Sequence, residues 1–132
     1  MAKRAIFAII LAASLFIAGC ERLGDDAEFA APKRITPSQA AEMMLGYDVI
    51  VIDVRTEGEF YAERIPYAIN IPASRIASQI LEEIHDFNQI ILIYCQSGRR
   101  SANAAQMLAE MGFARIYDFG GINDWPGARI PN

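Results

Sequence analysis

The sequence has 132 residues, 53% of them hydrophobic and 21% charged, which suits one globular domain and leaves little room for a second. Without Lys3 and Arg4, which lie in the N-terminal segment, ten basic residues face sixteen acidic residues, and the formal charge is −6. This acidic balance excludes general nucleic-acid binding, so no nucleic acid is expected among the partners. An anionic substrate would need a local positive site.

The first twenty residues have the pattern of an export signal. Lys3 and Arg4 precede an uncharged stretch at residues 5–19, which is shorter than the roughly 18 apolar residues of a spanning helix. The sequence IAGC at residues 17–20 resembles the bacterial lipobox, in which cleavage leaves a diacylated cysteine at the new N-terminus. We therefore predict that residues 1–20 are a lipoprotein signal peptide and that Cys20 is lipidated.

Lipidation would place the protein on a membrane after export. Burial is worth about 0.8 kcal/mol per methylene, so two or more acyl chains hold a protein there stably. Glu21 follows the cysteine, whereas the inner-membrane retention signal of enteric bacteria resembles Asp at this place. We expect an anchor facing the periplasm, in the outer rather than the inner membrane. An ordinary secreted chain or an uncleaved anchor is the alternative.

Residues 21–34 show no helical or strand period and are expected to form a flexible tether, followed by a domain over residues 35–132. Thr36, Pro37 and Gln39 then predict the start of a helix that Gly46 ends. The β-branched run at residues 49–53 is typical of a strand buried on both faces.

The second half of the chain continues this alternation. Thr56 and Glu59 predict a short capped helix that Pro66 stops, and a brief strand ends at Pro72. Residues 74–87 have the apolar period of a helix, and residues 89–94 form a strongly apolar strand. A helix from near Ser101 to residue 112, a strand at 115–119 and a Gly-rich turn at 120–127 follow. Alternating strands and helices predict an α/β domain with a largely parallel sheet.

Cys95 stands directly after the apolar strand, at the carboxyl end where such sheets bind ligands. The loop that follows, CQSGRR, leads into a helix, so amide groups and the helix N-terminus can surround an anion. Gly98 permits the tight turn, and Arg99 and Arg100 add donors that keep their charge. These features favour a thiolate, the nucleophilic form of cysteine. An inert buried cysteine is the alternative interpretation.

Five sequence pieces occur in an order and spacing that resemble a single-domain rhodanese. They are VIDVRTEGEF (51–60), RIPYAINIP (64–72), IILIYCQSGRRS (90–101), AAQMLAEMGF (104–113) and YDFGGINDWPG (117–127). The resemblance implies a doubly wound, mainly parallel five-stranded sheet flanked by helices. It also implies a sulfurtransferase that moves a sulfane sulfur from thiosulfate, or a similar small anionic donor, to cyanide or a thiol acceptor.

By this resemblance Cys95 is the catalytic nucleophile and carries the sulfur as a persulfide. The substrate would be held by the loop, mainly through its amides, and the residues concerned are Gln96, Ser97, Gly98, Arg99, Arg100 and Ser101. Arg100 falls on the family's usual loop arginine, whereas Arg99 stands where a small polar residue is frequent. For Arg55, which with Asp53 matches a pair after the first buried strand, substrate contact and ordering of the sheet edge both stay open.

Other positions are assigned no chemistry. The residues expected to be structural are Asp118, Gly120, Gly121 and Trp125. The chain departs from the family at residues 63–68, where Arg64 and Tyr67 replace a usual His and Gly, and this leaves the selectivity of the rim open. No cofactor and no metal site are expected, because His85 is the sole histidine and no nucleotide-binding motif is present.

Two other functions compete with the sulfurtransferase. A cysteine phosphatase resembles Cys-x5-Arg, but only four residues separate Cys95 from Arg100, and Ser101 occupies the place of the phosphatase arginine. A non-catalytic rhodanese-like binding module typically lacks the cysteine, which this chain retains together with a complete loop. The sequence therefore favours the enzyme.

Overall fold

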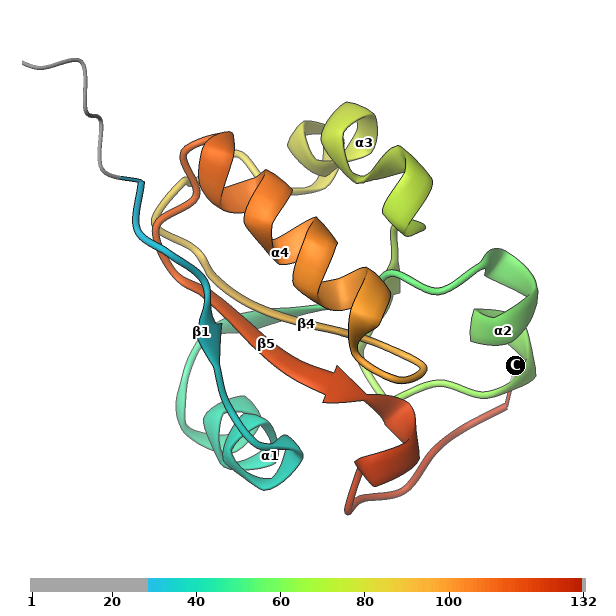
Figure 1. The fold of residues 1–132 in the computed structure, drawn as a ribbon. Coiled ribbons are helices and arrows are strands. Elements are labelled where there is room, and N and C mark those ends of the chain that lie inside the picture. The colour runs from blue at the N-terminus through green and yellow to red at the C-terminus, as the bar shows by residue number, and fades with distance from the viewer. Residues whose placement is uncertain (1–28, 132) are drawn as a thin grey trace, which may run out of the picture.

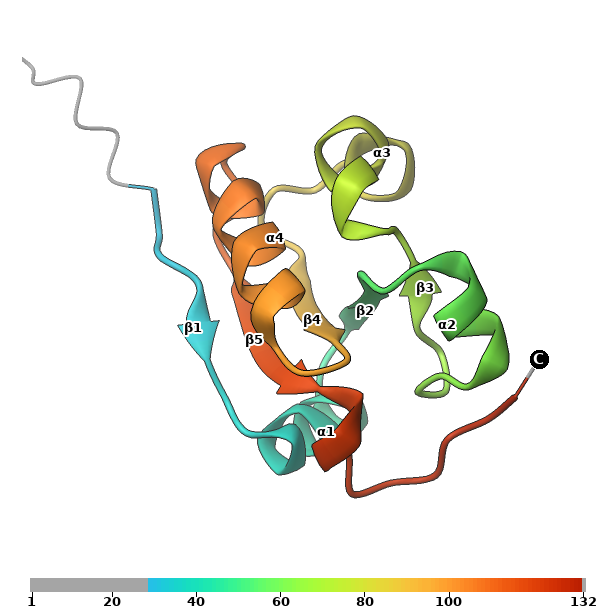
Figure 2. The same ribbon diagram turned by 45° about the vertical axis from the view of Figure 1, so that its right-hand side comes forward.

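The computed structural model describes residues 29–131; the predicted signal peptide with Cys20, and most of the predicted tether, lie outside the described residues. Five strands form one sheet in the order β1-β5-β4-β2-β3, parallel at every strand pairing (Figures 1 and 2). The strands are β1 Lys33–Arg34, β2 Val49–Asp53, β3 Ile69–Asn70, β4 Ile90–Cys95 and β5 Ile116–Gly121. The helices are α1 Pro37–Gly46, α2 Glu57–Ala62, α3 Ile76–Glu83 and α4 Arg99–Glu110, with short 3₁₀ turns at Ala73–Arg75 and Ile122–Asp124.

The sheet is covered on both faces, which confirms the predicted doubly wound α/β fold. In Figure 1, α3 and α4 lie on one side of the sheet and α1 on the other. Side chains alternate between the two faces of the sheet, and both faces are covered, so all six residues of β4 are buried. The set that packs with α3 and α4 is Ile91, Ile93 and Cys95, and the set that packs with α1 is Ile90, Leu92 and Tyr94.

Both predicted capping boxes are present. The hydroxyl groups of Thr36 and Thr56 accept from the amides of Gln39 and Glu59, whose side chains accept from the threonine amides in return. The helix predicted at residues 74–87 is shorter, because a 3₁₀ turn precedes it and extended backbone begins at Ile84. None of the helices in residues 29–131 combines the length and the apolar character that a bilayer crossing requires.

The first strand was not predicted. Lys33 and Arg34 pair in parallel with Tyr117 and Asp118 of β5, so the last two residues of the expected tether belong to the sheet. The folded part of the chain therefore begins before Ile35. Two exposed polar residues carry no strand pattern of their own; the neighbouring edge of β5 provides the hydrogen-bonding partners that make them a strand.

Where residues 63–68 depart from the usual sequence of the family, the backbone has an unusual conformation. Among the described residues, Tyr67 is the one non-glycine residue with a positive φ, 67°, and its side chain is 91% exposed. A bulky residue is strained there, whereas glycine is not. Arg64 pairs through its backbone with Ile130, and its guanidinium lies 4.9 Å from the ring centroid of Phe60.

Candidate active site

Cys95 ends β4 and is fully buried. Its Sγ accepts a hydrogen bond from the amide of Gly98 at 3.0 Å. The nearby amides of Ser97 and Ser101 and the Ser101 hydroxyl also act to lower its pKa. Burial by itself raises the pKa of this thiol, but the surrounding donors outweigh burial, and the pKa of Cys95 lies below its ordinary value. The loop therefore holds its cysteine in surroundings that favour the thiolate.

Gly98 sets the direction of the loop. Its φ of 102° lies in the left-handed region, and it forms the N-cap of α4. The helix consequently begins at Arg99, two residues before the predicted start near Ser101. Residues 99–101 thus form the first turn of α4, where the positive end of the helix dipole faces the sulfur.

A bulge in the pairing of β5 with β4 brings β5 close to the loop that follows Cys95. Ile93 pairs with Asp118 but Tyr94 pairs with Gly120, so the register skips one residue and sets Gly121 opposite Cys95. The backbone of Gln96 passes so close that a Cβ atom on Gly121 would overlap its carbonyl group. Gly121, expected to be structural, is therefore needed for a close approach between the sheet and the loop.

Arg55 lies at the edge of the loop but has its donors engaged by the protein. It is 3% exposed, its Nε and Nη2 atoms bond to the Asp53 carboxylate, and Nη2 also donates to the Glu63 carbonyl. Nη1 donates to the side chain of Gln96 at 3.2 Å, and Gln96 in turn donates to Asn123 at 2.6 Å. Of the two roles that the sequence leaves open, this geometry favours ordering of the sheet edge at Asp53 over contact with substrate, and the bond to Gln96 extends this ordering to the loop.

Arg100 pairs with Glu59, for which the sequence predicted only a role in helix capping. Its Nη1 and Nη2 atoms bond to the two carboxylate oxygens of Glu59 at 2.8 and 2.9 Å. This pair lowers the pKa of Glu59 to about 2, so the carboxylate stays charged throughout the neutral range. The pKa of Arg100 is raised, first by this hydrogen bond to Glu59 and to a smaller extent by the charge of Cys95, so Glu59 holds the loop arginine on the side of the sulfur.

Arg99 differs from both other arginines of the site. It is exposed, and among residues 29–131 its guanidinium has no ion pair or hydrogen bond. Arg55 is matched by Asp53, and Arg100 by Glu59. Arg99 therefore supplies the uncompensated side-chain charge of this loop.

Ser101 is buried at the place where a phosphatase would have its arginine. Its hydroxyl donates to the Asp118 carboxylate at 2.8 Å, so this side chain is bound to β5 and is not open to a ligand. His85 is exposed, and the residues described here bring together no group of three or more potential metal ligands.

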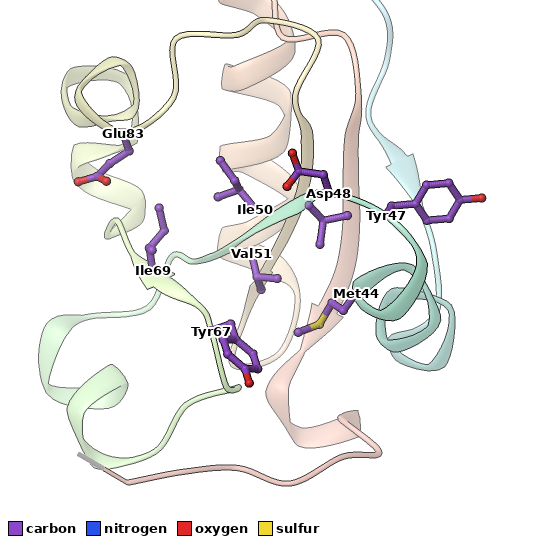
Figure 3. A pocket seen from close by; sticks show the side chains of 9 residues that line it. Met44, Tyr47, Asp48, Ile50, Val51, Tyr67, Ile69 and Glu83 are labelled. Carbon is purple, nitrogen blue, oxygen red and sulfur yellow. The ribbon is translucent and has the colours of Figure 1, made fainter.

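A hollow of about 500 Å³ lies elsewhere, between α1, the amino end of β2 and β3 (Figure 3). Its lining residues are Met44, Tyr47, Asp48, Val49, Ile50, Val51, Tyr67, Ile69 and Glu83. None of residues 95–101 lines it, and it contains no cysteine, serine or histidine. The reactive chemistry of the domain therefore lies in the loop after β4 and not in this hollow.

The fold agrees with comparisons to known proteins. Residues 36–128 match the rhodanese-like domain. The thiosulfate sulfurtransferase PspE of Escherichia coli (strain K12) is 36% identical over 73 residues, which are 55% of this chain and 70% of that protein. The thiosulfate sulfurtransferase GlpE of Glaesserella parasuis serovar 5 (strain SH0165) is 34% identical over 98 residues, 74% of this chain and 89% of that protein.

Two solved structures are similar as well. The structure of a rhodanese with anions from E. coli has a TM-score of 0.60 at 31% identity and covers 63% of this chain and 98% of its own. A rhodanese-like domain protein from Staphylococcus aureus has a TM-score of 0.67 at 28% identity, with coverages of 76% and 98%. The parallel sheet and the loop around Cys95 thus define an α/β domain with a cysteine held among amides at a strand end. The chain belongs to the rhodanese-like family and is an enzyme of the sulfurtransferase class.

Substitution Gly121→Ala tests the support of the loop. The added methyl group should displace the Gln96 backbone and misalign the amides around Cys95, and we expect at least a tenfold loss of sulfur-transfer rate, the size that small misplacements cause in active sites. Gly58→Ala is the matched control, because a Cβ atom there meets nothing within 4 Å. Equal rates for the two variants, measured on folded protein, would contradict this role of Gly121.

Proposed function

We propose that the protein transfers a sulfane sulfur from thiosulfate, or a similar small anionic donor, to cyanide or a thiol through a persulfide on Cys95. The thiolate attacks the outer sulfur of thiosulfate, the S–S bond of the donor breaks, and sulfite leaves with the bonding electrons. Cyanide then attacks the outer sulfur of the persulfide, giving thiocyanate and the free thiolate. With a thiol acceptor the sulfur passes to the acceptor's own sulfur.

The single observation that carries this proposal is the set of donors around Sγ of Cys95. A nucleophilic sulfur needs to be a thiolate, and the amides of Ser97, Gly98 and Ser101 favour that form without a paired base. The same donors are placed to stabilise the charge of a persulfide one atom further out. The names of the relatives, which are thiosulfate sulfurtransferases, support thiosulfate as the donor.

The two competing functions fit this geometry less well. A phosphatase loop needs an arginine for the phosphoryl oxygens at the position that buried Ser101 occupies, and a fully buried Cys95 suits a slender reagent. A binding module would have no need for an ordered loop that activates its cysteine. We therefore infer catalysis rather than binding alone.

We also propose that the enzyme is exported and lipid-anchored through Cys20, facing the periplasm and in the outer rather than the inner membrane. The lipobox-like sequence at residues 17–20 supports this proposal. Residues 30 and 31 lie beside Arg115 and Ile116, at the amino end of β5, whereas Cys95 is at the carboxyl end of β4 (Figure 1). The first described residues and Cys95 thus lie at opposite ends of the sheet.

The proposed reaction is tested on the chain lacking residues 1–20, in which Cys95 is the one remaining cysteine. After thiosulfate treatment, intact-mass analysis should show one additional sulfur atom, and addition of cyanide should remove it as thiocyanate. Cys95→Ser should do neither. Thiocyanate release that persists in this variant would refute the assignment of the nucleophile, and a wild-type chain that never gains sulfur would favour the binding module.

Arg99→Gln tests the role of the unmatched charge. Because a small dianionic donor is attracted by this exposed guanidinium, KM for thiosulfate should rise about fivefold, equivalent to roughly 1 kcal/mol, with little change in kcat. High salt should reduce the difference from the wild type. Arg115→Gln, which removes an exposed charge at the far end of the sheet, is the control and should leave KM unchanged. If Arg99→Gln and Arg115→Gln raised KM equally, the attraction would come from the net charge of the protein and not from the position of Arg99.

A further inference from the structure

The hollow at the amino end of β2 lies where the edge of the sheet is incomplete. β3 pairs with β2 only at Ile52 and Asp53, so residues 49–51 have β4 on one side and no strand of the described chain on the other. These three residues line the hollow, and Val49 and Ile50 are partly exposed. An open strand edge of this kind can pair with the main chain of another extended segment.

Tyr67 lines the same hollow in a strained conformation. Its φ of 67° lies in the left-handed region, which glycine adopts without strain and a bulky residue does not. The ring is 91% exposed, so packing within the domain offsets little of this cost. Strain that the surrounding structure does not offset is typical of functional sites. The exposed ring is therefore a candidate contact for a ligand.

Apolar side chains lie on both sides of Tyr67. Met44 and Ile69 line the hollow with it (Figure 3). A second hollow, of about 260 Å³, shares Met44 and Tyr67 and is lined also by Trp125 and by Leu45, which is exposed. Adjoining apolar hollows that are open to water favour a ligand with apolar groups of its own.

The charged part of the lining is negative. Asp48 and Glu83 are exposed, and in Figure 3 they lie on either side of Ile50. Among residues 29–131 neither carboxylate belongs to an ion pair. These charges disfavour a second copy of the chain, because a symmetric contact brings like charges together, and they repel an anionic lipid surface. The complementary group is a lysine or arginine side chain.

We propose that this hollow is a docking site for an extended segment of a partner protein, in which an apolar side chain lies next to a basic one. The apolar group packs on Met44 and the ring of Tyr67, and the main chain reaches the open edge of β2. The basic group pairs with Asp48 or Glu83. Because the hollow is at the amino end of β2 and Cys95 is at the carboxyl end of β4, a bound partner leaves the loop after β4 free.

The experiment is a titration of the nitrogen-15-labelled chain lacking residues 1–20 with short peptides blocked at both ends, followed through the amide chemical shifts. The probe peptide alternates lysine with valine. One control peptide has glutamate in place of lysine, and the other has serine in place of valine. The probe should shift the amides of residues 44–51 and 67–69 and leave those of residues 95–101 unchanged. It should bind about fivefold more tightly than either control, the size expected from two exposed ion pairs or from partial burial of apolar groups.

Variants of the chain assign the binding to the lining residues. Glu83→Gln should weaken binding of the probe peptide about threefold, because one exposed ion pair is lost. Glu82→Gln is the matched control, since it removes an exposed charge of the same helix outside the hollow and should leave binding unchanged. Tyr67→Gly should weaken binding about fivefold or more. Its thermal unfolding temperature should not fall, because glycine relieves the strained φ.

Binding that requires both the lysine and the valine of the probe, and that Tyr67→Gly weakens in a stable chain, supports the inference. No binding at millimolar probe, or equal binding of the serine control, would overturn it, as would equal effects of Glu82→Gln and Glu83→Gln. Shifts of the same amides when the chain alone is diluted would assign this face to a second copy and also overturn it. A less stable Tyr67→Gly chain would give the ring a structural role instead. None of these outcomes involves sulfur transfer, so the inference and the proposed function fail separately.

Discussion

The whole active site depends on the hydrogen bonds that the loop after β4 donates to one buried sulfur. Burial without partners would favour the neutral thiol, but the amide of Gly98 at 3.0 Å and the neighbouring donors reverse that preference. This arrangement requires a strand buried on both faces, a left-handed residue at Gly98 and a close contact at Gly121. The sheet, the helix start and the β5 bulge are therefore parts of one support for Cys95.

The charges around the loop follow the same logic. Two arginines at the first turn of α4 oppose the helix dipole, which costs stability unless anions are near. Glu59 compensates Arg100, and Asp118 with Arg34 forms a second neutralised pair behind the loop. Arg99 is left without a matching anion on the exposed side of the loop, where the proposed anionic donor would be attracted to it. A locally unfavourable arrangement of this kind is typical of functional sites.

Much of this could be predicted from the sequence, because strong local signals coincide with the tertiary structure. The apolar run ending at Cys95 is buried on both faces, and both threonine capping boxes form. β1 could not be predicted, since Lys33 and Arg34 become a strand only by pairing with β5. For the same reason the sequence could not predict two contacts of the site. Arg34 and Asp118 are 84 positions apart, and Glu59 and Arg100 are 41 positions apart. Gly98 alone gave a local signal for the earlier start of α4.

The most direct test compares the titration of Cys95 in the folded chain and in the same chain unfolded by urea, through the chemical shift of its isotope-labelled β-carbon. The account predicts a lower pKa in the folded state. The thiolate then adds to the free energy of unfolding above the unfolded-state pKa, and this contribution is lost as the pH falls through the folded-state pKa. A folded-state pKa equal to or above the unfolded value would contradict the account, because the loop would then stabilise no anion.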